Sequence, residues 1–316
     1  MANWVVVGSG ALGTLWALGL QQAGASVTIY SRHVEDSDGI TLTRTFDDHK
    51  YSADFPVITT STNAPDNAIW LLMVKAWQLA PLLKELQLDV NTPLIVSHNG
   101  MGAADDILQT QTPGTVFDLV TTHGAWRQQR THSYHAGLGQ SWIGARHSVT
   151  ENTTPDNANA SNNIDAHSQP VDRIPTWFDE LAAALPPLHW QPNITEKRWE
   201  KLAINCAINP LATLAEAANG VLRDESYAPN LRAICEEIAN VNTALDADEL
   251  LEQVREVIRN TAGNRCSMLQ DVDAKRRTEI DYLNGFICRE GERLLVATRE
   301  NCRLWEAIQA RERAYE

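Results

Sequence analysis

A glycine-rich run near the start of the chain has the residue types and the spacing of a turn that binds a dinucleotide. The run is Gly8-Ser9-Gly10-Ala11-Leu12-Gly13, and it follows the apolar residues 4–7. The first glycine of such a turn permits a tight bend, the second lets backbone approach a pyrophosphate, and the third lets the following helix pack closely on the strand. Because strand, turn and helix signals occur here in this order, we predict a dinucleotide-binding turn at the N-terminus of a helix.

The end of the second predicted strand indicates which dinucleotide binds. NAD-binding proteins usually place an Asp or Glu here to hold the ribose 2′-hydroxyl. This chain instead reads Tyr30-Ser31-Arg32, and the guanidinium of Arg32 can pair with a 2′-phosphate through two hydrogen bonds. We therefore predict NADPH, with the alternative that Arg32 is an ordinary solvated charge in a loop.

Two more polar residues lie at the ends of runs that we predict to be strands. Lys75 follows the run 68–74, and Asn99 follows the run 93–97. Ligands of open α/β sheets bind at the carboxyl ends of the strands. Lys75 can reach an anionic group of a cofactor or substrate, and Asn99 offers a donor and an acceptor to a nicotinamide or a hydroxyl. Both residue types are also common in ordinary loops.

A candidate proton donor lies on a predicted helix in the second half of the chain. Lys201, Asn205 and Asn209 recur every four residues and so share one face of that helix. Apolar residues cover much of the remaining surface, so the polar face should meet partners or a ligand. Reduction of a ketone needs such a donor for the nascent alkoxide. The alternative is that Lys201 pairs with Glu196 or Glu200 on a solvated face and that the asparagines bridge neighbouring helices.

Pro210 follows this polar face directly in the sequence. Its ring nitrogen has no hydrogen to donate, so it leaves the carbonyl group of Cys206 without its helical partner. We expect a kink or an end of the helix at this point.

A second group of candidates lies further along the chain. Ser267, with a glutamine three residues later, matches the capping-box pattern and predicts a helix N-cap, which is also a place that attracts a carboxylate. Apolar residues continue at helical spacing through 269–287, and Glu279 falls on their face. A carboxylate is unusual on a buried face, so Glu279 is a candidate functional residue. The alternative is an ion pair with Lys275 or Arg276 one turn earlier, which is more common for such a residue.

The elements that carry these residues divide the chain into two parts. Runs rich in Val and Ile alternate with longer segments up to about residue 145, which is typical of parallel strands joined by helices. After Trp177 apolar residues recur three and four positions apart, so the second part is predicted to be wholly helical. Strands are predicted at 4–7, 26–30, 68–74, 93–97 and 116–122, a helix at 11–23 and a hairpin at 134–145.

The predicted fold is therefore an α/β Rossmann-type dinucleotide-binding domain at 1–172 followed by an all-α domain at 173–316. A polar segment at about 148–171 has almost no large apolar residues, so burial of apolar surface cannot offset the conformational entropy that the segment would lose on ordering. We therefore interpret it as a surface insertion at the domain boundary. The chain has 316 residues of which 43% are hydrophobic, which is enough for two packed cores.

Charge and cysteine usage exclude several classes of protein. The formal net charge of -14 argues against nucleic acid or an anionic membrane as a partner, because both require a positive face. The five cysteines contain no CxxC pair, so they predict reduced thiols, neither a disulfide framework nor a metal site. The first residues show no targeting or membrane segment, so we expect a cytoplasmic location.

Several long strings in this chain resemble the ketopantoate reductase (2-dehydropantoate 2-reductase) family. In chain order they are GSGALG, VKAW, HNGMG, TTHGAW, KLAINCAINPL and SMLQDVDAKRRTEIDYLNG, and the resemblance covers nearly the whole chain outside the polar insertion. It implies NADPH-dependent reduction of ketopantoate to (R)-pantoate in pantothenate and coenzyme A biosynthesis. It also implies a helical second domain similar to the C-terminal domain of 6-phosphogluconate dehydrogenase.

The resemblance also implies roles for individual residues. Lys201 would be the catalytic acid, and Glu279 would position Lys201 and the bound ligands. The residues implied to hold the substrate are Asn99, Lys201, Asn205, Asn209, Asn219, Asn264 and Ser267. Those implied to hold the cofactor are Gly8, Ser9, Gly10, Ala11, Leu12, Gly13, Arg32, Lys75, Asn99, Glu279 and, through its backbone, Ala125.

The sequence leaves two alternative functions open. One is a reductase of another short branched 2-oxo acid, and the other is a non-catalytic NADP(H)-binding sensor. The expected partner is a small-molecule substrate, and the expected assembly is a monomer or a homodimer.

Overall fold

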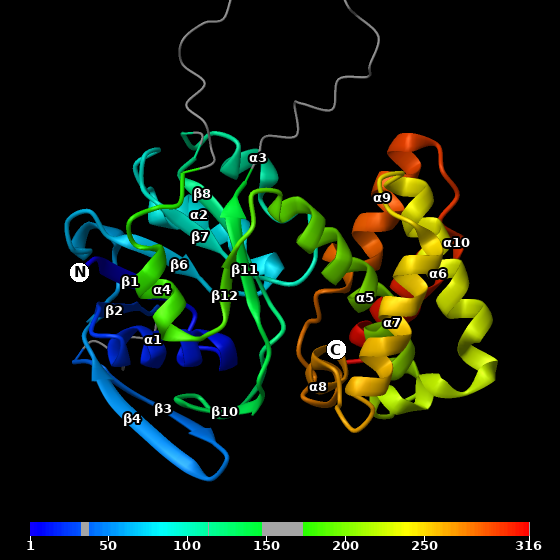
Figure 1. Cartoon of the computed structure of the whole chain (residues 1–316), viewed down its shortest axis with the longest axis horizontal. Coiled ribbons are helices and arrows are strands. Elements are labelled where there is room, and N and C mark those ends of the chain that lie inside the picture. The colour runs from blue at the N-terminus through cyan, green and yellow to red at the C-terminus, as the bar shows by residue number, and fades with distance from the viewer. Residues whose placement is uncertain (33–37, 113, 147–172, 316) are drawn as a thin grey trace, which may run out of the picture. The chain divides into compact units, whose positions relative to one another are not determined.

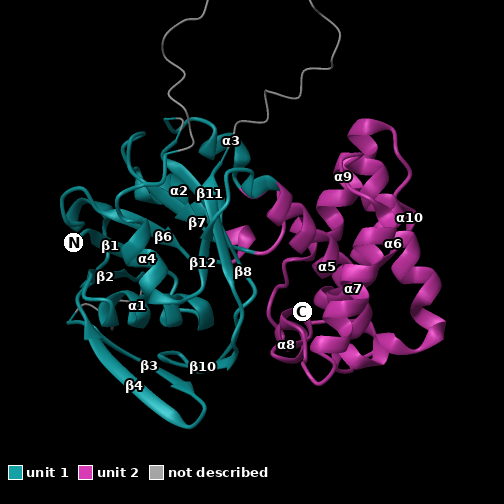
Figure 2. Ribbon diagram, in the orientation of Figure 1, with its two compact units in different colours: residues 1–74, 79–98, 104–195 teal, residues 75–78, 99–103, 196–316 magenta. Residues whose placement is uncertain are grey.

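The computed structural model describes residues 1–32, 38–112, 114–146 and 173–315, and these form two compact units (Figures 1 and 2). Unit 1 comprises Met1–Val74, Leu79–His98 and Ala104–Thr195. Unit 2 comprises Lys75–Gln78, Asn99–Ala103 and Glu196–Glu316. The short segments at Lys75 and Asn99 thus pack with the C-terminal helices, although each follows a strand of the sheet in unit 1. The predicted insertion at 148–171 lies outside the described residues, and the predicted domain limits of 1–172 and 173–316 stay a prediction.

Unit 1 is built on an eight-stranded sheet whose strands are parallel except at one edge. Its order is β12-β11-β8-β7-β6-β1-β2-β5, with β11 antiparallel to β8 and parallel to β12. The buried apolar runs found in the sequence supply the central strands, so the five predicted strands are confirmed with ends that differ by a few residues. The strands are β1 (Asn3–Val7), β2 (Ser26–Tyr30), β5 (Val57–Ile58), β6 (Ile69–Leu72), β7 (Leu94–Val96), β8 (Val116–Thr121), β11 (Ser141–Ala145) and β12 (Leu188–Trp190).

A second, four-stranded sheet covers the outer side of the first helix. Its order is β4-β3-β10-β9, and α1 packs on both sheets with α4 beside it (Figure 1). Leu15, Trp16 and Leu18 of α1 are fully buried in the core that results. The strands are β3 (Ile40–Phe46), β4 (His49–Phe55), β9 (Gly124–Gln129) and β10 (His132–Gly137); the helices are α1 (Ala11–Gln22), η2 (Ser61–Asn63), α2 (Ala76–Leu86), α3 (Asp105–Leu108) and α4 (Phe178–Ala184).

Two sequence predictions for unit 1 are wrong. The segment 134–145 is not a hairpin, because β10 pairs with β9 and β3 whereas β11 pairs with β8 and β12 in the other sheet. The region after Trp177 is not wholly helical, because β12 joins the main sheet. Pro186 and Pro187 precede this strand and disfavour helical backbone there.

Unit 2 consists of helices around a second core. Leu202, Ile234, Val254 and Leu304 are among its buried members. Together the two units confirm the predicted Rossmann-type α/β sheet followed by helices. The helices are α5 (Ile194–Leu214), η4 (Asn219–Arg223), η5 (Glu225–Tyr227), α6 (Ala228–Val241), α7 (Ala247–Asn260), α8 (Ser267–Asp273), η6 (Ile280–Tyr282), α9 (Asn284–Leu294) and α10 (Arg299–Arg313).

The helical run predicted around Ser267 and Glu279 is broken in the structure. Helix α8 ends at Asp273, Lys275 adopts a left-handed φ of 52°, and Glu279 lies outside regular helix just before η6. Ser267 is not the N-cap: Cys266 holds that position, and its sulfur accepts from the amide of Leu269. The apolar spacing continued across the break because both short helices face the same core.

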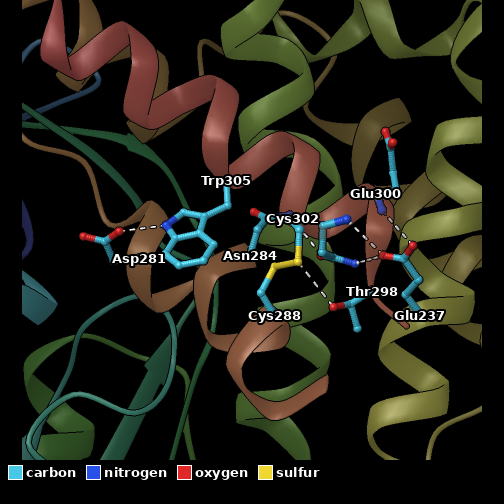
Figure 3. Close-up of a disulfide and its surroundings, with 9 residues drawn as sticks. Glu237, Asp281, Asn284, Cys288, Thr298, Glu300, Cys302 and Trp305 are labelled. Carbon is cyan, nitrogen blue, oxygen red and sulfur yellow. Dashed lines mark hydrogen bonds between the residues drawn. A yellow bond between two sulfur atoms is a disulfide. The ribbon is translucent and has the colours of Figure 1, made fainter. Parts of the chain in front are cut away.

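The expectation of five reduced thiols is wrong for one pair. Cys288 of α9 and Cys302 of α10 form a disulfide, because the two helices pack with these Cα atoms 5.6 Å apart (Figure 3). The remaining cysteines, Cys206, Cys235 and Cys266, are free and buried. Within the described ranges, no helix is long and apolar enough to cross a membrane.

Candidate active site

The glycine turn of unit 1 has the predicted steric character. Gly8 has a left-handed φ of 95°, and a side chain there would collide with the carbonyl of Met73. A β-carbon on Gly13 would overlap the carbonyl oxygen of Gly8, so only glycine lets α1 approach β1 this closely. At Gly10 an added β-carbon would meet nothing within 4 Å. The fold therefore needs the first and third glycines, whereas the open space at the second suits an approaching ligand.

The N-terminus of α1 opens directly at this turn. Gly10 is the N-cap, and its carbonyl accepts from the amide of Thr14 at 3.0 Å. The first turn carries no acidic side chain. The unpaired amides and the helix dipole therefore present positive charge that no neighbouring carboxylate in that turn offsets, which fits a pyrophosphate.

Arg32 lies just beyond β2 and is exposed. Its guanidinium is 3.4 Å from a carboxylate oxygen of Glu85, and the hydroxyl of Tyr30 donates to the other oxygen of that carboxylate at 2.6 Å. Burial, together with Glu85, raises the pKa of Tyr30 to about 12. An exposed ion pair of this kind holds a side chain weakly, so Arg32 can exchange Glu85 for a phosphate.

Ala125 lies in β9, in the four-stranded sheet. It is partly buried, pairs with His135 of β10 and packs against the core of unit 1. Its predicted backbone contact with the cofactor stays a prediction.

Glu279 is the centre of a hydrogen-bonded cluster in unit 2. It is 5% exposed, and its Oε1 accepts from the amides of Ala76 at 3.0 Å and Asn99 at 3.3 Å. Its Oε2 accepts from Asn99 Nδ2 at 2.9 Å and lies 3.5 Å from Lys75 Nζ. The structure thus brings three of the predicted residues, Lys75, Asn99 and Glu279, into direct contact. The alternative partners of Glu279, Lys275 and Arg276, are not needed to explain its burial.

Lys75 also contacts an acid that the sequence prediction missed. Its Nζ lies 2.6 Å from Oδ2 of Asp271, which is 4% exposed. Burial by itself would lower the pKa of Lys75, but the charges of Glu279 and Asp271 outweigh it and raise that pKa. Asp271 stands three residues after Met268 and so on the same helix face, but only the structure shows that this face is buried.

Lys201 has the properties expected of an acid near neutral pH. It is partly buried in α5, and desolvation lowers its pKa to about 8 against the opposing effect of the Glu279 charge. Glu200 does not neutralise it, because Glu200 pairs with Lys197 at 2.7 Å. Lys201 and Glu279, which are far apart in sequence, therefore influence each other within unit 2.

The polar face of α5 is present as predicted, but Pro210 does not end the helix. Helix α5 continues to Leu214, and the carbonyl of Cys206 that Pro210 leaves unpaired accepts from Nδ2 of Asn284 at 3.1 Å. Asn284, which lies beside the disulfide (Figure 3), also donates to Asn301 Oδ1. A buried side chain thus replaces the missing helical donor.

Four of the remaining candidate substrate residues, Asn209, Asn219, Asn264 and Ser267, lie in or are linked to the segment at the start of α8. Cys266 Sγ donates to the carbonyl of Asn209 at 3.6 Å, which ties the end of the α5 face to α8. The carbonyl of Asn264 accepts from the amide of Asn219 at 2.9 Å. Asn264 and Ser267 are exposed, Asn205 is partly buried and Asn209 is buried.

Asn219 carries an unsatisfied acceptor. Its Nδ2 donates to Thr261 Oγ1 at 2.9 Å, but its buried Oδ1 has no hydrogen-bond partner within the described structure. A buried acceptor without a donor costs free energy, so it fits a site that a ligand hydroxyl completes.

The chemistry available in unit 2 is therefore acid–base and anion recognition by amides, hydroxyls and lysines. No group of three or more His, Cys, Asp or Glu residues arranged to hold a metal occurs within residues 1–32, 38–112, 114–146 and 173–315. A Rossmann-type sheet with a ligand-accessible glycine turn, followed by helices that carry a lysine of lowered pKa, is the architecture of a nicotinamide-dinucleotide oxidoreductase.

Comparison with known proteins gives the family. The family described as "Ketopantoate reductase PanE/ApbA" matches residues 4–148, and "Ketopantoate reductase PanE/ApbA C terminal" matches residues 193–312. The chain is 36% identical to the 2-dehydropantoate 2-reductase of Vibrio cholerae serotype O1 over 99% of both chains. It is 34% identical to that of Shigella flexneri over 98% of this chain and 95% of the relative. The chain belongs to the ketopantoate reductase family.

Solved structures show the same fold. The ternary structure of D-mandelate dehydrogenase with NADH and anilino(oxo)acetate superposes with a TM-score of 0.82 at 23% identity, covering 99% of each chain.

Proposed function

We propose that this chain reduces ketopantoate to (R)-pantoate with NADPH, as a step toward pantothenate and coenzyme A. Besides the family, the observation that carries this proposal is the desolvation of Lys201, which lowers its pKa and which the charge of the buried Glu279 partly offsets. A lysine whose pKa lies at about 8 is a stronger acid than an ordinary lysine, yet it is still mostly protonated at neutral pH.

The chain's own residues have three tasks in this reaction. The bound nicotinamide supplies the hydride. Lys201 stabilises the developing alkoxide with its positive charge and then donates a proton to it. Glu279 favours the charged form of Lys201, and its hydrogen bonds with Asn99 orient the amide that we assign to the nicotinamide and the substrate.

Arg32 supports NADPH as the dinucleotide. Its guanidinium is exposed, and its weak contact with Glu85 is replaceable. A 2′-phosphate offers two oxygens for a paired hydrogen bond, whereas a ribose hydroxyl would leave the guanidinium with little to bind. We assign the remaining cofactor contacts to the glycine turn, Lys75 and the backbone of Ala125.

We assign the substrate to the amide and hydroxyl groups of unit 2. The assigned residues are Asn99, Lys201, Asn205, Asn209, Asn219, Asn264 and Ser267. The orphan oxygen of Asn219 suits the 4-hydroxyl of ketopantoate. A site built to bind a hydroxyl discriminates against an analogue that lacks it by on the order of a hundredfold or more.

The test is NADPH oxidation with ketopantoate, with 2-oxoisovalerate and without substrate, for the unaltered protein and for Lys201→Ala. We expect the unaltered protein to turn over ketopantoate and the variant to be slower by on the order of a hundredfold or more. Because the protonated lysine is the active form, kcat/KM should fall as pH rises above about 8. Equal rates on 2-oxoisovalerate would indicate a reductase of another branched 2-oxo acid, and NADPH binding without turnover would indicate a sensor.

The proposal also covers the cellular location and the oligomeric state of the protein. We place the protein in the cytoplasm as a monomer or a homodimer, and sedimentation of the purified chain measures the assembly.

A further inference from the structure

Asp271 is a buried acid to which neither the proposed reaction nor the predicted site residues give a role. It lies in α8 and is 4% exposed. One of its oxygens is 2.6 Å from Lys75 Nζ, and the other accepts from Arg276 Nε at 3.1 Å. Burial of a carboxylate costs free energy, which its contacts with Lys75 and Arg276 offset. We therefore expect removal of the Asp271 charge to change the position of Lys75.

We propose that Asp271 is a positioning residue: it holds the Lys75 ammonium so that Glu279 stays available to Asn99 and to Lys201. This inference rests on the proposed function, in which Lys201 is the acid. Asp271 acts through Lys75 and need not touch the substrate or the cofactor.

The distances show which of the two acids, Asp271 or Glu279, lies closer to the Lys75 ammonium. Its ammonium lies 2.6 Å from Asp271 but 3.5 Å from Glu279, at the limit of a hydrogen bond. The same Glu279 oxygen has a shorter bond, at 2.9 Å, with the side chain of Asn99. Lys75 is therefore bound chiefly by Asp271, and Glu279 retains the geometry that holds Asn99.

The charges show why two lysines near Glu279 require a second acid. Lys75 and Lys201 are both within electrostatic reach of Glu279, and desolvation of Lys201 makes its charge sensitive to that carboxylate. By charge alone Glu279 acts on Lys75 more strongly than Asp271 does, but Asp271 supplies a second negative charge and the shorter contact with the ammonium, at 2.6 Å. Among the described residues, the charge of Asp271 also acts on the exposed Arg276, which contacts it, and on Cys266 and Tyr315.

Removal of the Asp271 charge should therefore act at a distance on Lys201. In Asp271→Asn the Lys75 ammonium loses its closer acid and shifts toward Glu279, which weakens the attraction between Glu279 and Lys201. The pKa of Lys201 falls, so the loss of kcat/KM at high pH should begin about one pH unit lower than in the unaltered protein. Lys75→Met removes the competing positive charge and should move this limb of the profile to higher pH.

The experiment measures kcat/KM for ketopantoate against pH at saturating NADPH in both single variants and in the double variant Asp271→Asn/Lys75→Met. Opposite shifts in the single variants and a profile near the original in the double variant are expected. Asp273→Asn is the matched control: it makes the same change in the same helix, on an exposed acid that pairs with Arg265. Shifts of the same sign, or a shift in the control as large as that in Asp271→Asn, would overturn the proposal.

A second readout does not depend on turnover. NMR titration of the lysine side-chain amines, with Lys201 assigned through Lys201→Ala, reports the pKa of Lys201 in the enzyme alone. A titration midpoint that moves down in Asp271→Asn and up in Lys75→Met is expected, and unmoved midpoints would overturn the inference. If the unaltered protein does not reduce ketopantoate, the proposed function fails while this titration still decides the role of Asp271. If Asp271→Asn does not fold, the direction of the Lys75→Met shift decides.

Discussion

Gly13 lies so close to the carbonyl oxygen of Gly8 that a side chain at Gly13 would displace β1 or α1, whereas Gly10, between them, faces open space. Gly10 also has an ordinary φ of -72°, which any residue adopts. The fold therefore requires Gly8 and Gly13, whereas it leaves Gly10 without a steric constraint, and we assign Gly10 to the cofactor.

This difference predicts opposite behaviour of two alanine variants. Gly10→Ala should unfold within about 0.5 kcal/mol of the unaltered protein but bind NADPH at least tenfold more weakly, because the added methyl group occupies space that the pyrophosphate needs. Gly13→Ala should lose about 1–3 kcal/mol of unfolding free energy through overpacking. Urea unfolding and fluorescence titration with NADPH measure the two effects. Unchanged NADPH binding in Gly10→Ala would contradict the assigned role of this turn.

The buried amide of Asn284 gives a prediction about α5, the helix of Lys201. Asn284→Ala leaves the carbonyl of Cys206 and the side chain of Asn301 without a donor, so it should destabilise the protein by about 1–3 kcal/mol. Pro210→Ala restores a helical donor to that carbonyl, so the double variant should recover part of the loss. Chemical unfolding of the two single variants and the double variant measures the coupling. Strictly additive effects would show that the proline and the asparagine do not share this carbonyl.

The disulfide gives a prediction that a thiol count can decide. Denatured protein without reductant should show three reactive thiols, those of Cys206, Cys235 and Cys266. Because the crosslink joins residues 14 apart, its reduction should lower the unfolding free energy by about 3 kcal/mol. Cys302→Ser should show the same lowered stability with and without reductant. Five reactive thiols before reduction would contradict the disulfide.

The sequence predicted the site better where chemistry and periodicity coincided. The glycine turn was found because its strand and helix are adjacent in the chain, and the α5 face because Lys201, Asn205 and Asn209 recur at helical spacing. Convergence of Lys75 and Asn99 on Glu279 brings together residues that are 204 and 180 positions apart, so the spacing of residues in the sequence does not predict it. Asp271 was missed for a different reason: without the fold, nothing distinguished it from the acids around it.

The errors in the predicted fold have a common physical origin. The segment 134–145 has the local pattern of a hairpin, but β10 pairs with the preceding strand β9 and with the distant β3, whereas β11 pairs with β8 and β12 in the other sheet. Alternation of apolar and polar residues predicts a strand but does not show which strand it pairs with. The run through Glu279 kept its apolar period across the end of α8, because the core of unit 2 selects apolar residues whether or not the backbone between them is helical.

The contact between His123, which directly precedes β9, and His135 of β10 predicts a loss of stability in mild acid. Nδ1 of His123 accepts from the amide of Gly139 at 3.1 Å and lies 3.2 Å from Nε2 of His135, so this nitrogen must be unprotonated. Burial, with the neighbouring His135, lowers the pKa of His123 to about 4.

The lowered pKa of His123 determines how the unfolding free energy changes with pH. An unfolded histidine gains its proton near pH 6.5, whereas the folded His123 gains it only near pH 4, so the unfolded state binds more protons between these values. The stability that neutral His123 contributes is present above pH 6.5 and is lost as the pH falls toward 4. Between pH 7 and pH 5 the loss should be on the order of 2 kcal/mol. His123→Gln, which cannot gain a proton, should lose less stability over this range, whereas His49→Gln, at an exposed position in β4, should keep the original pH dependence. Urea unfolding at the two pH values measures the difference, and an unchanged pH dependence in His123→Gln would show that another group titrates.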